Sequence, residues 1–201
     1  MRRLFLALGL VLAAGPAWAF DLPAEAHQAL ARGEAWFEVR PDRAGAAGQV
    51  HAVEDVAAPP ERVFAVMTDC ALAPRMAPSL KSCRVLERDP AGRWDVREHV
   101  SRPMLFVPSV RSVFRSDYDP PRGFTYRRTG GDLRVLEGDW RLTPLDGGAR
   151  TRVVYEGRAA LPFAVPHALA RAVLRQQVSQ ALAALRRECL AGDGPASKPG
   201  S

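Results

Sequence analysis

The sequence is poor in lysine, and it lacks the charge runs that mark a nucleic-acid-binding surface. Lys81 and Lys198 are the only lysines, so arginine supplies nearly all of the 28 basic residues, which outnumber 22 acidic ones and give a net charge of +6. The arginines are spread along the chain, and aromatic residues are not interleaved with them as they are in base-stacking proteins. The sequence therefore argues against a nucleic-acid partner.

Residues that carry chemistry are also scarce. The chain has three cysteines and four histidines, and none of them falls at the spacing of a zinc site. It has no Gly-x-Ser-x-Gly nucleophile motif and no glycine-rich phosphate loop. We therefore expect no metal and no cofactor, and these absences favour a binding protein over an enzyme.

No apolar run reaches the roughly 20 residues that a membrane-spanning helix needs. One apolar run, residues 4–14, follows Arg2 and Arg3 and precedes small residues, so residues 1–19 have the parts of a secretory signal peptide in the right order. We expect cleavage between Ala19 and Phe20, and a periplasmic or secreted protein. The alternative is an uncleaved N-terminal anchor. The residues around the arginine pair favour the general secretory route over twin-arginine export.

An exported chain can keep disulfides, because they persist outside the cytoplasm. Cys70 and Cys83 lie close together around a proline-containing segment, and we expect them to pair. Closing a loop of this length stabilises a fold by about 3 kcal/mol in the chain-entropy model. The competing interpretation, a metal site, lacks a histidine or third cysteine at ligand spacing. Cys189 is left over, and we expect it to be a buried or unpaired thiol.

The rest of the chain predicts one domain, residues 34–190, preceded by a short segment at 20–33 and followed by a polar, disordered tail at 191–201. Prolines and apolar spacing predict two short helices, at 58–69 and within 71–76. Alternating segments bounded by Gly and Pro turns predict an antiparallel meander. The predicted strands are 36–40, 50–57, 83–88, 93–102, 107–118, 124–128, 133–144 and 151–161.

A single long helix is predicted at the end of the domain, over residues 166–189. Its apolar residues recur at helical spacing and form one face. They are Leu174, Val178, Ala181, Leu182, Leu185 and Cys189. The order of elements suits a strongly curved antiparallel sheet that grips this helix.

Several local strings in this order resemble the START-like superfamily, also called SRPBCC, the polyketide cyclase/dehydrase and lipid transport group with its coenzyme Q-binding-like members. Residues 58–64 (APPERVF) resemble the start of the family's first short helix, and Thr68-Asp69 its end. Residues 131–142 (GDLRVLEGDWRL) resemble a family strand with a glycine two positions before a tryptophan, and 147–155 the following hairpin.

The resemblance covers about residues 50–187 and implies an α+β helix-grip fold. In this fold a curved antiparallel sheet wraps around a long C-terminal helix, two short helices follow the first strand, and a deep apolar cavity lies between sheet and helix. Members bind sterols, phospholipids, quinones, polyketides or plant hormones, and some catalyse cyclisation. Fold alone does not decide between these functions.

Side-chain parity selects candidates for the cavity wall. Alternate residues of a strand share a face, so 94–102 offers one set, and the resemblance implies that the sets on 138–142 and 153–155 face inward. The alternative for any one of these residues is ordinary core packing. Gly138 removes bulk opposite the helix, which suits a ligand or a close backbone contact. The candidates are Trp94, Val96, Glu98, Val100, Arg102, Gly138, Trp140, Leu142, Val153, Tyr155, Leu174 and Val178.

Glu98 is adjacent to His99, so the two side chains cannot both line one cavity on a regular strand. A cyclase could use Glu98 or Arg102 as a polar cavity group, but no catalytic set is predicted.

Two apolar loops, 103–108 and 161–166, are expected near the cavity mouth. With Arg102 and Arg111 beside the first, they could dip transiently into an anionic bilayer. The alternative is that they cover the cavity and pack on each other. The residues concerned are Met104, Leu105, Phe106, Leu161, Phe163 and Val165.

We therefore expect an exported protein that binds a hydrophobic small molecule, such as a lipid, a sterol-like compound or an isoprenoid, and acts as its carrier. One alternative is a cyclase/dehydrase-type enzyme acting on a polyketide-like or aromatic substrate. The other is a structural or partner-binding domain with a filled core.

Overall fold

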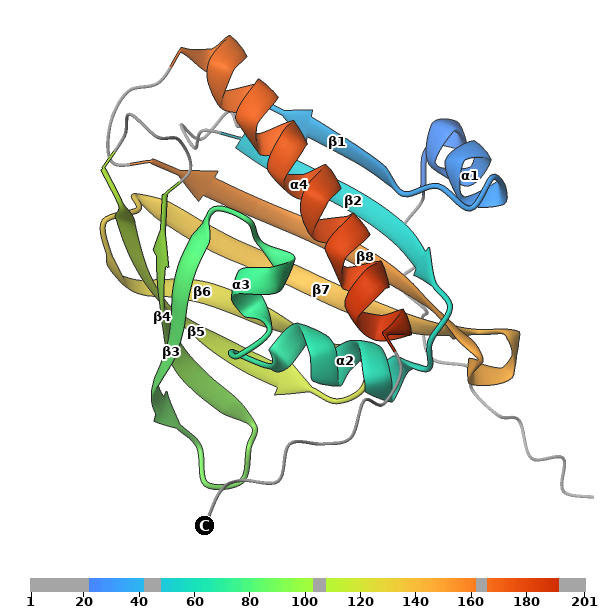
Figure 1. Cartoon of the computed structure of the whole chain (residues 1–201), viewed down its shortest axis with the longest axis horizontal. Helices are drawn as coiled ribbons and strands as arrows, with labels where there is room; N and C mark the ends of the chain where they lie inside the picture. The colour runs from blue at the N-terminus through green and yellow to red at the C-terminus, as the bar shows by residue number, and fades with distance from the viewer. Residues whose placement is uncertain (1–21, 42–47, 103–107, 162–165, 192–201) are drawn as a thin grey trace, which may run out of the picture.

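The computed structural model describes residues 22–41, 48–102, 108–161 and 166–191. Eight strands form one antiparallel sheet in the order β1-β2-β8-β7-β6-β5-β4-β3, and the long helix α4 crosses its concave face (Figure 1). The expected helix-grip α+β fold is confirmed.

The elements follow the predicted order, with ends that shift by up to three residues. The helices are α1 (Ala24–Ala31), α2 (Pro60–Thr68), α3 (Ala73–Met76) and α4 (His167–Leu190), with a 3-10 turn, η1 (Asp146–Gly148). The strands are β1 (Trp36–Arg40), β2 (Gly48–Val56), β3 (Leu80–Arg88), β4 (Trp94–Ser101), β5 (Val110–Asp119), β6 (Gly123–Gly131), β7 (Val135–Leu145) and β8 (Arg150–Ala160).

The strands from β3 to β8 each pair with the next, as a meander does. The sheet continues because β8 also pairs with β2, from Gly48 opposite Ala159 to Val56 opposite Thr151. Helices α2 and α3 and strands β3 to β7 therefore lie, along the chain, between β2 and β8, which are neighbours in the sheet. Pro60 begins α2, where its fixed φ suits a first helical turn and its missing N–H is not needed.

Helix α4 packs mainly against β1 and β2 on one side and against α2 and α3 on the other. Its C-terminal half is buried at Leu182, Ala184, Leu185 and Cys189, whereas Leu169 near its start is 39% exposed. The main core cluster joins this C-terminal half to the sheet and α2. Its members are Val56, Ala58, Val63, Val66, Leu142, Val153, Leu185 and Cys189.

The N-terminal helix α1 lies on the other side of the sheet from α4. Ala26 and Leu22 pack with Val53 and Val154, whose neighbours Glu54 and Val153 point toward α4. Helix α1 thus covers the outer face of β2 and β8. None of the helices in the described ranges is long and apolar enough to cross a membrane.

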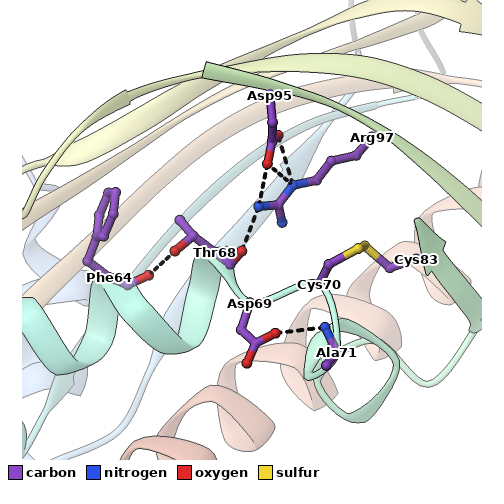
Figure 2. Close-up of polar contacts among 8 residues, drawn as sticks. All are labelled: Phe64, Thr68, Asp69, Cys70, Ala71, Cys83, Asp95 and Arg97. Atoms are coloured by element: carbon purple, nitrogen blue, oxygen red, sulfur yellow. Dashed lines mark hydrogen bonds and ion pairs between the residues drawn. A yellow bond between two sulfur atoms is a disulfide. The ribbon is translucent and has the colours of Figure 1, made fainter. Parts of the chain in front are cut away.

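The Cys70–Cys83 disulfide forms, which confirms the predicted pair. It ties the connection between α2 and α3 to strand β3 (Figure 2). Cys189 is free and buried in the core cluster.

Candidate ligand-binding cavity

A cavity of about 410 Å³ lies between the sheet and the helices α2, α3 and α4. Its size falls in the range of small-molecule sites, about 300–1,000 Å³. Apolar and aromatic side chains predominate among the lining residues. They are Met67, Ala73, Met76, Ala77, Ser79, Leu80, Arg97, His99, Ser101, Ser112, Phe114, Phe124, Tyr126, Leu133, Leu136, Trp140, Gln177, Ala181, Leu182 and Leu185.

Aromatic rings build the sheet-side wall. The ring centroids of Trp140 and Phe124 are 6.2 Å apart in a stacked arrangement, and Phe114 meets Tyr126 edge-on at 5.6 Å. Behind them, Tyr155 stacks on Trp140 at 4.2 Å. Such contacts add to the energy of burial and hold each ring in one orientation. The wall is therefore pre-formed.

Two glycines make room for two of these rings. Gly138 and Gly157 are paired across β7 and β8. A Cβ on Gly138 would lie 2.6 Å from the Tyr126 hydroxyl oxygen, and one on Gly157 would lie 1.9 Å from that of Tyr155. The space at Gly138 is thus occupied by the Tyr126 side chain, which is neither the ligand nor the close backbone contact that the sequence suggested.

The hydroxyl oxygens of these tyrosines are 2.6 Å apart, which is a hydrogen bond. Burial, the largest cause in both residues, raises the pKa of Tyr126 and Tyr155 above their ordinary value. Both hydroxyls are therefore neutral at physiological pH.

Arg97 on β4 lines the cavity near the C-terminus of α2. Its guanidinium donates to both carboxylate oxygens of Asp95 at 2.9 Å, and to the backbone carbonyl of Thr68 at 2.5 Å (Figure 2). Asp95 and Arg97 are both buried. A cation is favourable at the carbonyl end of a helix, and the paired carboxylate balances its charge.

His99 lies two residues further along β4 and points into the same cavity. Its ring meets Phe114 edge-on, with centroids 4.8 Å apart. Its Nε2 atom is buried and has no hydrogen-bond partner among the described residues. Burial and then the nearby Arg97 charge lower the pKa of His99 to about 4, so the imidazole is neutral at physiological pH.

Small polar residues complete the lining. Ser101 and Ser112 lie on β4 and β5, and the Ser79 hydroxyl donates to Gln177 on α4 at 3.0 Å. A largely apolar cavity with a few polar groups is typical of a small-molecule site.

Residues 56–186 match the family described as polyketide cyclase/dehydrase and lipid transport. The chain belongs to this family. The START-like resemblance inferred from the sequence is thereby confirmed, and the protein is a START-like domain that binds hydrophobic small molecules.

Solved structures agree with this assignment at the level of the fold. A STAR-related lipid transfer protein fragment from Xanthomonas axonopodis gives a TM-score of 0.62 at 17% identity, covering 78% of this chain and 93% of that one. A protein of Thermus thermophilus gives 0.61 at 23% identity, covering 73% and 99%. The Zhui aromatase/cyclase of a Streptomyces species gives 0.55 at 22% identity, covering 71% and 91%. Among curated proteins, none matches the sequence significantly.

The START-like sheet corrects the expectation for β4. The candidates on this strand do share a face, but the cavity is lined by the opposite one, through Arg97, His99 and Ser101. On the outer face, Glu98 pairs with Arg84 and Arg111. Trp94 lies under the guanidinium of Arg115, 4.3 Å from its ring centroid. The displaced candidates are Trp94, Val96, Glu98, Val100 and Arg102.

The physical reason is an inverted pattern. Alternation puts the apolar residues of β4 on the outer face, which normally indicates the buried side. The inner face instead carries Asp95 and Arg97, and their mutual pairing allows both to be buried. Side-chain parity therefore predicted correctly which residues of β4 share a face. The face that it predicted to line the cavity is the outer one.

On β7 and β8 the candidates divide between cavity and core. Trp140 lines the cavity, while Leu142 and Val153 belong to the filled core cluster. Tyr155 reaches the cavity indirectly, through its bond to Tyr126.

Two candidates on α4 and one beside the sheet lie outside the lining. Leu174 faces the start of β2, where its Cδ2 is 3.1 Å from the position of a Cβ on Gly48. Val178 and Leu161 are partly buried and are not among the lining residues. The remaining mouth candidates lie outside the described residues. They are Met104, Leu105, Phe106, Phe163 and Val165.

Most of the lining residues were not among the candidates predicted from the sequence, although some signals for them were present. Gln177 and Ala181 are four residues apart on the predicted helix and so share a face. Phe124 and Tyr126 are two residues apart on one strand, so their side chains also share a face. The contributions of Met67 and Met76 carried no such signal, because they depend on how α2 and α3 lie over the sheet.

Proposed function

We propose that this START-like domain is an exported carrier that takes up one hydrophobic small molecule, such as a lipid, a sterol-like compound or an isoprenoid, and shields it from water. The observation that supports this most is the cavity of about 410 Å³ between sheet and helices, with its mainly apolar lining. Burial of apolar ligand surface there is favourable by about 25 cal/mol per Å². A structural domain with a filled core would not need this space.

The polar groups of the described lining favour a carrier over a cyclase or dehydrase. Arg97 is bound to Asp95, and the Ser79 hydroxyl is bound to Gln177. His99 has a pKa of about 4, whereas a general base works best with a pKa near the operating pH. None of these groups forms the nucleophile-and-base pair that covalent catalysis needs.

Lipid analysis of the purified protein tests the carrier role. Protein isolated from the periplasm is expected to show, in native mass spectrometry, one copurifying or exchangeable hydrophobic molecule per chain. Ala181→Leu, which places bulk in the cavity, serves as a control that should carry less. Absence of any bound lipid, or turnover of a polyketide-like substrate by the purified protein, would count against a carrier.

Export is part of the proposal. The signal-like residues 1–19 motivate it, and the Cys70–Cys83 disulfide supports it because such bonds persist outside the cytoplasm. Fractionation and N-terminal sequencing are expected to find mature protein that begins at Phe20. Recovery of the full-length chain in the cytoplasm would contradict export.

Transient membrane contact through the two apolar loops completes the proposal. The parent protein is expected to float with vesicles that contain anionic lipids. Less of the Phe106→Asp or Phe163→Asp variant should float with them. If both variants bind vesicles as the parent does, docking through these loops is ruled out.

A further inference from the structure

The cavity ends where the packed core begins, and a small set of side chains forms the boundary. Among the described residues, four line the cavity and also belong to the main core cluster or pack against it. They come from α2, α3, β7 and α4, and they are Met67, Met76, Trp140 and Leu185. We call these four residues the cavity floor.

Helix α4 shows this boundary as a step in side-chain size. Gln177, Ala181 and Leu185 follow one another at intervals of four residues, so they share a helix face, and all three line the cavity. Ala181 is small and partly exposed, whereas Leu185 is 4% exposed. Cys189, one turn further along the same face, is buried in the core cluster. The helix therefore passes from the cavity to full packing at Leu185.

Strand β7 gives the same boundary independently. Leu136, Trp140 and Leu142 share one face of the strand, because they are separated by even numbers of residues. The first two line the cavity, whereas Leu142 belongs to the core cluster and is not among the lining residues. Trp140 packs against this cluster, of which Leu185 is a member. Two elements that are distant in sequence thus end the cavity at one cluster.

The residues of the cavity floor differ in how firmly they are held. Trp140 stacks on Tyr155, with ring centroids 4.2 Å apart, and Leu185 is buried within the core cluster. Met67 and Met76 are only partly buried, and an unbranched thioether side chain adapts to what it packs against. The firm part of the cavity floor is therefore Trp140 and Leu185. The size of Leu185 can be changed without removing a stacked ring.

Helix geometry gives the depth of the cavity above its floor. Gln177 and Leu185 both line the cavity and are 8 residues apart, which corresponds to roughly 12 Å at about 1.5 Å of helix rise per residue. A fully extended chain advances by about 1.2 Å per bond, so about ten carbons span this depth. A longer chain has to bend or to leave part of its length outside.

We infer that Leu185 is a specificity-determining residue, which closes the inner end of the cavity together with Trp140 and sets the longest apolar chain that the cavity can bury. This inference rests on the proposed carrier function. A carbon that enters the cavity leaves water and tightens binding by about fourfold, whereas a carbon that the cavity floor keeps out adds little. Affinity should therefore rise with chain length up to a break and then level off.

A series of straight-chain alcohols, from hexan-1-ol to tetradecan-1-ol, measures this break by displacing the fluorescent probe N-phenyl-1-naphthylamine. In the parent protein we expect the break at about ten carbons. Leu185→Ala removes three carbon atoms from the cavity floor and should move the break up by about three carbons, whereas Leu185→Phe adds bulk and should move it down. Leu185→Val disturbs the core less and should move the break up by about one carbon, so it tests the same shift if the alanine variant does not fold.

Leu182→Ala is the matched control for these variants. Leu182 is 4% exposed and lines the cavity, like Leu185, but it is not part of the core cluster. Its replacement by alanine removes the same atoms from the side of the cavity and not from the cavity floor. The break should therefore stay at the chain length of the parent protein.

The outcomes separate the inference from the carrier role. If the alcohols displace the probe but the parent protein shows no break, the carrier role stands and the inference is overturned. The same holds if no Leu185 variant moves the break, or if Leu182→Ala moves it as far as Leu185→Ala does. If neither the probe nor any alcohol binds, both are overturned.

Discussion

The interior beneath helix α4 has two halves, one packed and the other a cavity. In the packed half, Leu185 and Cys189 join the core cluster with α2 and β7. The cavity half is lined by Gln177, Ala181 and Leu182, and Leu185 borders both halves. One helix thus packs into the core at its C-terminal end and bounds the ligand site over the turns just before it.

The difference follows from what the sheet offers beneath each half. Under the packed half, Val56, Leu142 and Val153 are large enough to meet the helix. The cavity half is lined by Ser101 and Ser112 and by aromatic rings of β5, β6 and β7 that contact one another. In the cavity half the rings therefore pack on one another, and the space between them and α4 remains as the cavity.

The largest expected effect comes from truncating equivalent leucines on β7. Leu142→Ala removes a fully packed side chain, and we expect it to lower the free energy of unfolding by about 2–5 kcal/mol. Leu136→Ala, in the same strand, enlarges a cavity that already exists and should cost clearly less. Urea denaturation of both variants measures this, and equal losses would mean that the two halves are equally packed.

The disulfide supports the cavity half, because residues between Cys70 and Cys83 supply part of its wall, including Met76 and Leu80. Replacing both cysteines by alanine should cost about 3 kcal/mol of unfolding free energy and weaken ligand binding. Cys189→Ala, a control in the packed half, should leave ligand binding unchanged. Unchanged hydrogen exchange over residues 70–83 in the double variant would contradict a supporting role.

Much of the fold could be predicted, because its signals are local. Prolines 59 and 60 mark the start of α2, and glycine and proline turns mark the meander. The apolar face of 166–189 identified α4, and the cysteine spacing identified the disulfide.

The cavity wall could not be predicted in the same way, because it depends on which face of each strand turns inward. On β4 this was decided by the pairing of Asp95 with Arg97, a property of two side chains together and not of an alternation pattern. On β7 the same strand face contributes Trp140 to the cavity and Leu142 to the core. That division depends on where α2 and α4 lie, which no local signal records.

A smaller effect is expected from adding bulk at two positions on α4, one buried against its neighbours and one facing the cavity. Ala184 is 1% exposed, so Ala184→Leu should overpack the helix against its neighbours and cost about 1–3 kcal/mol. Ala181→Leu extends into the cavity and should change stability little. It should weaken binding of N-phenyl-1-naphthylamine, an uncharged fluorescent probe of apolar cavities. Thermal denaturation compares the stability of the two variants, and titration with this probe compares their binding. Loss of stability in Ala181→Leu as large as in Ala184→Leu would show that the space is not free.

The smallest effect is a pair of opposite pH dependences, one from each half. Under the packed half, Glu54 is 1% exposed, and burial, opposed by its partner Arg186, raises its pKa from 4.5 to about 7. Folded Glu54 therefore keeps a proton that the unfolded chain has lost, so its contribution to stability falls as pH rises from 4.5 to 7. In the cavity, the pKa of His99 is lowered from 6.5 to about 4. The contribution of His99 to stability therefore rises as pH rises from about 4 to 6.5.

Each slope is at most about 1.4 kcal/mol per pH unit, and the two oppose each other between pH 4.5 and 6.5. Relative to the parent protein, Glu54→Gln should therefore gain stability as pH rises through this range, and His99→Phe should lose it. Urea denaturation at several pH values measures both differences, and groups common to all three proteins cancel. A Glu54→Gln curve parallel to that of the parent would mean that Glu54 is ionised in the fold. Helix α4 would then be held to β2 by an ion pair between Arg186 and Glu54, not by a neutral carboxyl group.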